Sequence, residues 1–297
     1  MAGSLPLRGL IQLAASVVLL SSAWPLTKLA LDRGASPLWL AEARAVLSGL
    51  TAAAVLLARH RLVWPRRADW PAVVAVGLFQ LGIYFALAHE AVAWVTAGRT
   101  SILANTTTIW VVPLSLLILH EHIPARRWLA SLIGMAGVGV LVGPWAIDWR
   151  SAHVLIGNGM LLGAALSWSI AIITLRRAPP KSGMFEVLPA CFLIASLVLL
   201  PLLALRDPAG GFGPHPEAWA AILYIGCIAG PLGTWCVLEA TAVLPSVVSS
   251  VGFLATPAVG LVLSNLILGE PFTTDLVTGS ALILAGVGLA AWPGRRR

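Results

Sequence analysis

Ten apolar stretches of about 20 residues follow one another along the 297-residue chain. A helix needs about 20 apolar residues to cross the hydrocarbon core of a bilayer. The stretches are continuously apolar rather than alternating, which predicts helices and not a β-barrel. Connections of at most about eleven residues leave no room for a soluble domain. The predicted spans are 10–30, 37–58, 70–91, 98–119, 126–145, 154–176, 184–205, 217–239, 246–268 and 273–292.

The composition agrees with a membrane protein. Hydrophobic residues make up 59% of the chain and charged residues only 10%, whereas soluble domains carry about 25% charged residues. No phosphate-binding Gly-x-x-x-x-Gly-Lys-Ser/Thr loop is present, so the chain alone does not hydrolyse ATP. The three cysteines lie inside spans without a Cys-x-x-Cys pair, which favours packing over a disulfide or a metal site.

The basic residues predict the orientation. Of the 19 Lys and Arg, 13 lie on the side that holds both termini, three lie on the other side and three lie inside spans. Basic residues concentrate on the cytoplasmic side of membrane proteins. We therefore expect a multi-pass protein of the cell (inner) membrane with both termini in the cytoplasm. The net charge of +7 reflects topology and does not indicate nucleic-acid binding.

The second half of the chain repeats features of the first. An apolar run ends in Leu-Ile-Leu, one further residue and a glutamate at both Glu121 and Glu270, 149 residues apart. The same offset relates the Ala-Gly-Val-Gly sequences within 134–142 and 283–291, Glu90 and Glu239, and Ser101 and Ser250. Trp24 and Trp168 also occupy matching segments, at an offset of 144. The alternative is chance self-alignment of apolar sequence, which explains the glycines better than the charged and hydroxyl positions.

Five spans are an odd number, so a second copy must enter the membrane upside down relative to the first. The predicted fold is therefore an all-α membrane protein with ten transmembrane helices in two inverted five-helix repeats, residues 1–146 and 147–297. Many secondary transporters have this construction, with a site between the halves and alternating access by rocking.

Several segments resemble the EamA-type members of the drug/metabolite transporter superfamily. They are SSAWPLTKLAL, LWLAEARAVLSGL, LSWSIAIITLRR, LLILHEHI and NLILGEPFTTDLVTGSALILAGVGLA. The resemblance covers essentially the whole chain. It implies ten helices in two inverted repeats and export of small metabolites across the bacterial inner membrane, as in YddG-type amino-acid exporters.

The first repeat departs from this family pattern, because His120-Glu121-His122 replaces Gly-Glu-Pro. Two histidines at i and i+2 point about 200° apart on a helix, whereas zinc-binding helices use i and i+4. We therefore expect a helix end here, and neither a metal nor a cofactor.

The candidate substrate-binding residues are aromatic or hydrogen-bonding side chains away from the predicted interfaces. Such groups inside a membrane face other helices or a cavity. Packing is the alternative for each tryptophan. The candidates are Trp24, Tyr84, Asn105, Thr106, Trp110, Trp168, Ser249 and Ser250.

Prolines inside spans indicate bent helices, because each leaves the carbonyl four residues earlier without its helical partner. Pro25, Pro113 and Pro257 are the candidates for gating or structural positions. A bent helix lining a cavity and an ordinary kink are both compatible with this pattern.

The charges inside spans lie near predicted span ends, which argues against a fixed charge at the centre of the site. They are Lys28, Glu42, Arg44, Glu90, Arg99 and Glu239. Glu90 and Arg99 flank one short turn, so they are expected to pair as an outer latch. Val248 matches Arg99 in the second repeat, so Glu239 has no such partner. Alternatively, both glutamates only mark helix ends.

Together these features predict a secondary transporter that exports small amphipathic metabolites, with aromatic or hydrophobic amino acids favoured. Its partners are a small-molecule substrate and the lipid bilayer, and the oligomeric state stays open. The alternatives are a membrane-embedded enzyme, for which the sequence offers no convergent catalytic group, and a structural membrane protein, which leaves the repeat unexplained.

Overall fold

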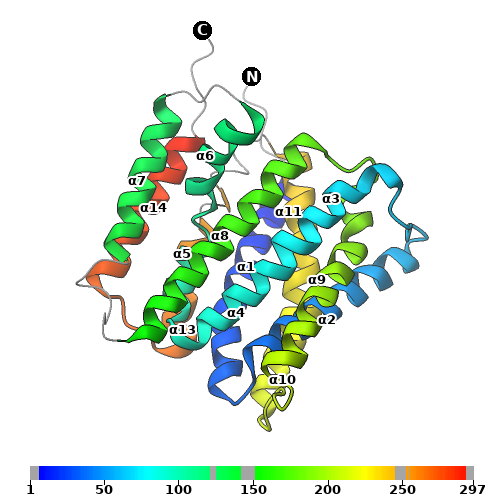
Figure 1. The fold of residues 1–297 in the computed structure, drawn as a ribbon, viewed down its shortest axis with the longest axis horizontal. Helices are drawn as coiled ribbons and strands as arrows, with labels where there is room; N and C mark the ends of the chain where they lie inside the picture. Colours follow the sequence, from blue (N-terminus) through cyan, green and yellow to red (C-terminus); the bar gives the residue numbers. More distant parts are fainter. Residues whose placement is uncertain (1–6, 121–124, 142–150, 245–251, 254, 292–297) are drawn as a thin grey trace.

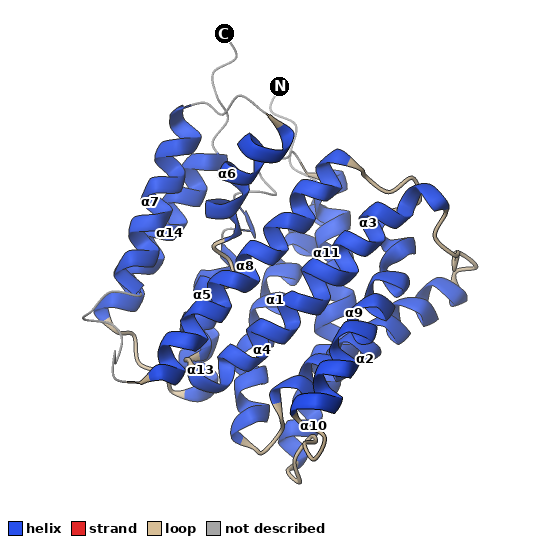
Figure 2. Ribbon diagram, in the orientation of Figure 1, coloured by secondary structure: helices blue, strands red, loops and turns tan. Residues whose placement is uncertain are grey.

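The computed structural model describes residues 7–120, 125–141, 151–244, 252–253 and 255–291, and within these ranges the chain forms helices and no strand (Figures 1 and 2). Six helical segments are long and apolar enough to cross a membrane, and four shorter apolar helices accompany them. They follow the ten predicted stretches in order. The predicted all-helical membrane fold is confirmed.

In the first half, two of the predicted spans are not continuous α-helices. The third stretch includes a π-helical segment, η2, and the fourth is broken between α5 and α6. The elements are α1 (Leu7–Asp32), α2 (Pro37–Ala58), the 3-10 turn η1 (Arg67–Asp69), α3 (Trp70–Val74), η2 (Ala75–Ile83), α4 (Tyr84–Trp94), α5 (Ala97–Leu103), α6 (Thr107–Leu119) and α7 (Ala125–Leu141).

The second half has a corresponding order. Its eighth stretch contains a second π-helical segment, η3. The elements are α8 (Ala152–Arg177), α9 (Met184–Arg206), α10 (Pro216–Leu223), η3 (Tyr224–Ala229), α11 (Gly230–Val243), α13 (Ala255–Leu268) and α14 (Thr274–Ala291). The boundary predicted between residues 146 and 147 lies outside the described residues.

The helices pack as two halves exchanged by a pseudo-twofold axis. Helix α1 contacts α11 and α13 of the other half, and its counterpart α8 contacts α4 and α6. The equivalent helices α2 and α9 contact each other, as do α7 and α14 (Figure 1). This reciprocity is what an inverted repeat requires.

The two π-helical segments begin at Ala75 and Tyr224, which are 149 residues apart. Each contains a glycine at a close helix crossing. A Cβ at Gly77 would lie 2.7 Å from Cβ of Ile194, and one at Gly226 would lie 2.6 Å from Cβ of Leu47. Because a larger side chain would clash at either crossing, the glycines are fixed by packing of each half against the other. No pattern in the sequence predicted this pair.

The repeated Ala-Gly-Val-Gly sequences have the same explanation. A Cβ at Gly137 of α7 would lie 2.8 Å from the carbonyl oxygen of Gly279 on α14. A Cβ at Gly286 of α14 would lie 2.7 Å from the carbonyl oxygen of Ala130 on α7. Small residues let these two helices approach closely, so the motif marks their crossing.

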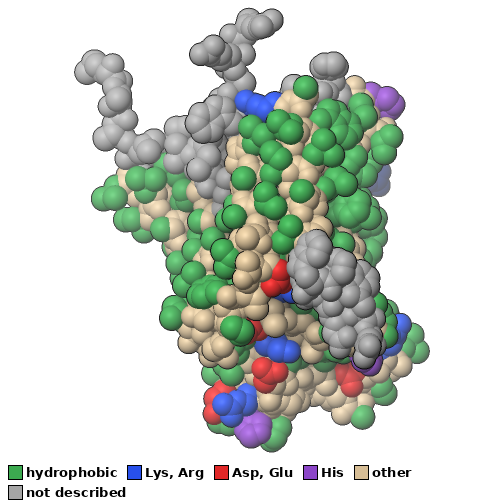
Figure 3. Space-filling model, turned by 90° about the vertical axis from the view of Figure 1, so that its left-hand side faces the viewer, with side chains coloured by type: hydrophobic (Ala, Val, Ile, Leu, Met, Phe, Trp, Pro, Cys, Tyr) green, Lys and Arg blue, Asp and Glu red, His purple; other side chains and the backbone are tan. Residues whose placement is uncertain are grey.

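The outer surface is largely apolar. Exposed side chains include Leu197 on α9 and Leu266 on α13. Figure 3 shows the face that includes α7 and α14, where hydrophobic side chains cover most of the height and most visible charges gather at the end away from the termini. Lipid is the solvent that suits such a surface.

We call the end of the bundle where α1 begins the near end, and the end where α1 finishes the far end. At the far end, the backbone N–H of Ser36 donates to the carbonyl of Gly211 at 2.8 Å. At the near end, the Asp69 carboxylate accepts from the backbone N–H groups of Lys181 and Ser182 at 2.6 and 3.0 Å. Each end is therefore tied across the two halves.

Candidate functional site

Trp24 and Trp168 approach the same residue from opposite halves. The Tyr84 ring centroid lies 6.2 Å from that of Trp24 on α1 and 4.7 Å from that of Trp168 on α8, both in edge-on geometry. Trp24 and Tyr84 are each only 5% exposed. Three predicted substrate-binding residues therefore form one aromatic cluster between the halves, and their role in binding stays a prediction.

Asn105 and Thr106 lie in the break between α5 and α6. The Asn105 amide donates to the carbonyl of Ser101 at 2.6 Å, and the Thr106 hydroxyl donates to that of Leu103 at 2.7 Å. Both side chains thus bond backbone carbonyls of α5, directly before the break. Interrupted helices are tolerated inside membranes where protein or a cavity surrounds them.

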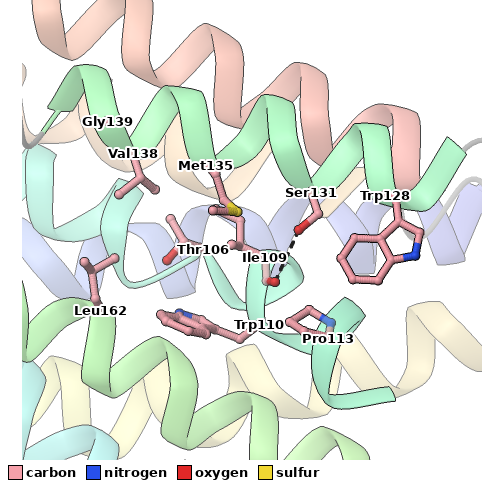
Figure 4. A pocket seen from close by; sticks show the side chains of 10 residues that line it. All are labelled: Thr106, Ile109, Trp110, Pro113, Trp128, Ser131, Met135, Val138, Gly139 and Leu162. Carbon is pink, nitrogen blue, oxygen red and sulfur yellow. Dashed lines mark hydrogen bonds between the residues drawn. The ribbon is translucent and has the colours of Figure 1, made fainter. Parts of the chain in front are cut away.

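A cavity of about 630 Å³ adjoins this break, between α6, α7 and α8 (Figure 4). Its walls are mainly apolar and aromatic, with hydroxyl groups from both sides. Two predicted binding residues, Thr106 and Trp110, line it together with the predicted gating residue Pro113. The other lining residues are Ile109, Trp128, Ser131, Met135, Val138, Gly139 and Leu162.

Pro113 explains one polar contact in this cavity. A proline removes the N–H that would bond the carbonyl four residues earlier, here that of Ile109. The Ser131 hydroxyl of α7 donates to this carbonyl at 3.4 Å (Figure 4). The predicted need of the Ile109 carbonyl for another partner is confirmed, and the partner comes from the facing wall of the cavity.

Trp110 contributes an unused donor. Its indole Nε1 is buried and has no hydrogen-bond partner within the described part of the chain. A buried donor without an acceptor typically costs about 1–3 kcal/mol. An oxygen acceptor on a bound solute would satisfy this group, which supports Trp110 as a contact residue.

The remaining predicted positions fall in three classes. Pro25 is buried in α1 directly after Trp24, and Pro257 is buried in α13. Ser249 and Ser250 lie outside the described residues. Glu90 and Arg99 are described, and the structure corrects their predicted pairing.

Arg99 does not pair with Glu90, so the latch prediction was wrong. Its Nη2 lies 2.9 Å from Oδ2 of Asp275 at the start of α14, and its Nη1 donates to the carbonyl of Leu141 at 2.8 Å. The physical reason is the break after α5, which lets α5 dock on α13 and α14 instead of continuing beside α4. The matching Glu239 forms an exposed ion pair with Arg8 at 3.5 Å.

The repeated Leu-Ile-Leu-x-Glu ending is a helix C-cap. His120 after α6 has φ 52°, and Gly269 after α13 has φ 70°, so both occupy the left-handed conformation that ends helices. The glutamate after Gly269 then turns toward the other half. Glu270 accepts hydrogen bonds from the backbone N–H groups of Ala97 and Gly98 at 2.7 and 2.8 Å.

Glu270 therefore caps the first turn of α5, whose free N–H groups favour a carboxylate. We call the contacts of Glu270 and Asp275 with residues 97–99 the far-end clasp. The repeat singles out Glu270 in the sequence, but its partner was not predicted, because nothing in the sequence shows which helix start lies beside it.

A known protein family matches each of the two halves separately. The EamA-like transporter family matches residues 7–143 and 155–292. A probable terminal-alkyne amino-acid exporter of Streptantibioticus cattleyicolor is 27% identical over 96% of this chain and 97% of its own length. An uncharacterized transporter of Archaeoglobus fulgidus is 25% identical over 85% and 87%. A pseudopaline exporter of Pseudomonas aeruginosa is 26% identical over half of each chain.

A crystal structure shares the fold across nearly the full length. It matches with a TM-score of 0.66 at 20% sequence identity and covers 97% of this chain and 96% of its own. At that identity the match concerns the fold alone.

Proposed function

We propose that this chain, which belongs to the EamA-like transporter family, exports small amphipathic metabolites, with aromatic or hydrophobic amino acids first among them. The family is one of transporters and not of enzymes. Membership makes the chain a multi-pass membrane protein that moves a small molecule across the bilayer. The identity of the solute and the direction of transport are what we propose.

The cavity beside the broken fourth span carries the proposal. Sites for small molecules typically measure about 300–1,000 Å³ and combine apolar or aromatic walls with a few polar groups. The cavity of about 630 Å³ meets both criteria. Its unused Trp110 donor and its Thr106 and Ser131 hydroxyls suit a solute that has an apolar body and a few hydrogen-bonding atoms.

The names of two relatives support this solute class. The full-length match is described as a probable amino-acid exporter, and the half-length match as an exporter of pseudopaline. At 27% and 26% identity these names support small-metabolite export as a class, and they leave the individual solute to experiment.

The packing of the two halves supports transport by alternating access. Reciprocal contacts allow one half to rock against the other about the pseudo-twofold axis. In this proposal the far-end clasp holds the outer side closed, and its release opens that side. The distribution of Lys and Arg supports a cytoplasmic near end.

Solute counterflow tests the proposal. Purified protein in liposomes preloaded with unlabelled phenylalanine, leucine or tryptophan is expected to accumulate the same labelled amino acid transiently. Protein-free liposomes and liposomes with a Trp110→Ala variant are the controls. Sealed proteoliposomes that exchange none of these solutes would favour the structural-protein alternative.

A further inference from the structure

Arg44 lies inside the bundle and carries guanidinium nitrogens that no other described residue hydrogen-bonds. It is the eighth residue of α2, so helical rise places it roughly 10 Å from the start of that span. Its buried Nε and Nη1 atoms have no hydrogen-bond partner within the described part of the chain.

Aromatic rings surround the guanidinium group. Its central carbon lies 4.4 Å from the ring centroid of Phe85 and 6.0 Å from that of Trp24. The His89 ring lies 5.6 Å from Phe85 and 6.3 Å from Trp24, and its Nδ1 is 2.8 Å from the Phe85 carbonyl oxygen. Ring faces attract a cation, but they accept no N–H···O hydrogen bond.

The nearest acid in sequence does not neutralise Arg44. Glu42 precedes it by two residues, which on a helix directs the side chain about 200° away. One Glu42 carboxylate oxygen accepts a hydrogen bond from the Ser196 hydroxyl of α9. The ion pairs formed by the described residues do not include Arg44.

A buried, unpaired guanidinium is unfavourable unless a further group binds it. The planar fork of Arg matches a carboxylate, which can accept two parallel N–H bonds. The residue is only partly buried as a whole, although these two nitrogen atoms are buried. Trp24 also contacts Tyr84, which places Arg44 beside the aromatic cluster that joins the halves.

We propose that Arg44 is an anion anchor for transport: it binds the carboxylate of the solute, whose apolar part contacts Trp24 and Phe85, at a second subsite between the halves that is separate from the cavity beside α6. This inference rests on the proposed function and restricts its substrate class. Small carboxylates with an apolar side chain are selected over their amides and amines.

Paired ligands test the anchor. Wild-type protein in nanodiscs of phosphatidylcholine, which contain no anionic lipid headgroup, is titrated with L-phenylalanine and L-phenylalaninamide and with L-leucine and L-leucinamide. Tryptophan fluorescence and the melting temperature report binding. We expect each acid to bind at least tenfold tighter than its amide.

Arg44→Gln is expected to weaken acid binding by roughly 30-fold or more, as when one partner of a buried charge pair is lost, and to abolish the preference over the amide. Arg44→Lys keeps the charge without the fork and should lower the preference in part. If Arg44→Gln does not fold, the acid-over-amide preference measured with Arg44→Lys is the test of the anchor. Arg33→Gln, at an exposed far-end pair with Glu217, is the matched control and should behave as wild type.

Two results would overturn the anchor while leaving transport intact. One is equal binding of acid and amide by the wild-type protein. The other is an acid preference that survives in Arg44→Gln or is unchanged in Arg44→Lys. If the wild-type protein binds neither member of either pair, the proposed amino-acid function fails, and the anchor fails with it.

Discussion

The guanidinium of Arg99 and the carboxylate of Asp275 approach to 2.9 Å across the boundary between the two halves, and their side chains are only 12% and 16% exposed. The 149-residue offset assigns Val248 and Arg126 to the corresponding sequence positions of the other repeat. Those residues cannot form an ion pair. The repeat therefore does not duplicate the Arg99–Asp275 ion pair, and the near end is joined by other contacts, such as those of Asp69 with residues 181 and 182.

Loss of this ion pair should destabilise the protein. We expect Asp275→Ala or Arg99→Ala to lower the free energy of unfolding by roughly 1.5–3 kcal/mol, as for a hydrogen bond to a charged group. The double variant should cost less than the sum of the two singles. Thermal melting in detergent measures the effect. Glu239→Ala is the control, because it removes an exposed ion pair in which the Arg8 side chain is 73% exposed and the Glu239 side chain 37%. This change should lower the free energy of unfolding by less than about 1 kcal/mol. Additive single effects would show that the pair contributes nothing.

Glu270 should control access to the first turn of α5. Ala97 is fully buried under the Glu270 carboxylate, so Ala97→Cys should react slowly with a membrane-impermeant maleimide added to intact cells. Adding Glu270→Ala removes both acceptor oxygens, and the labelling rate should rise several-fold. Glu217→Ala, which removes an exposed acid elsewhere at the far end, is the control. Equal rates in all backgrounds would contradict a closing role.

The aromatic cluster should matter more for transport than interfacial tryptophans do. Trp24→Ala and Trp168→Ala are expected to lower the rate by about tenfold or more, the effect of losing a central aromatic anchor. Tyr84→Phe keeps the ring that both tryptophans contact and should retain most activity. Trp64 and Trp219 are 70% and 46% exposed, so their alanine variants are the controls. If all four alanine variants lose the same fraction of the transport rate at matched expression, Trp24 and Trp168 only pack and do not bind the solute.

Pro113→Ala should change the transport rate more than the protein yield. Alanine restores an N–H that competes with Ser131 for the Ile109 carbonyl, so α6 should straighten at the cavity wall. Pro257→Ala in α13 is expected to act in the same direction. Counterflow rates are compared with yields after size-exclusion chromatography. Loss of folded protein with an unchanged specific rate would show that the kinks serve assembly.

Reporter fusions test the orientation. A fusion after Gly210, in the far-end loop between α9 and α10, should report an extracytoplasmic location. A fusion after Ser182, in the near-end loop held by Asp69, should report the cytoplasm. The reverse pattern would invalidate the positive-inside argument.

The sequence by itself determined the helices and the duplication. Apolar length decides whether a segment crosses a bilayer, because backbone groups in lipid must be satisfied within a helix. The 149-residue offset is visible in the sequence because the same residue types recur at both positions. The repeated Leu-Ile-Leu-x-Glu sequence also predicted the helix ends at His120 and Gly269. Pro113 predicted a carbonyl in need of a partner, since the missing N–H is a covalent property of proline.

Only the tertiary structure decided which groups meet. Arg99 was assigned to Glu90 because the two flank one turn, but the break at residues 104–106 turns α5 toward α14, where Asp275 is closer. The Gly77 and Gly226 crossings and the Glu270 cap depend in the same way on helices far apart in the chain. Arg44 looked like a charge near a span end, and only packing shows that rings rather than acceptors surround it. Charge pairing depends on distances of a few ångströms between helices, and hydropathy along a single chain does not encode those distances.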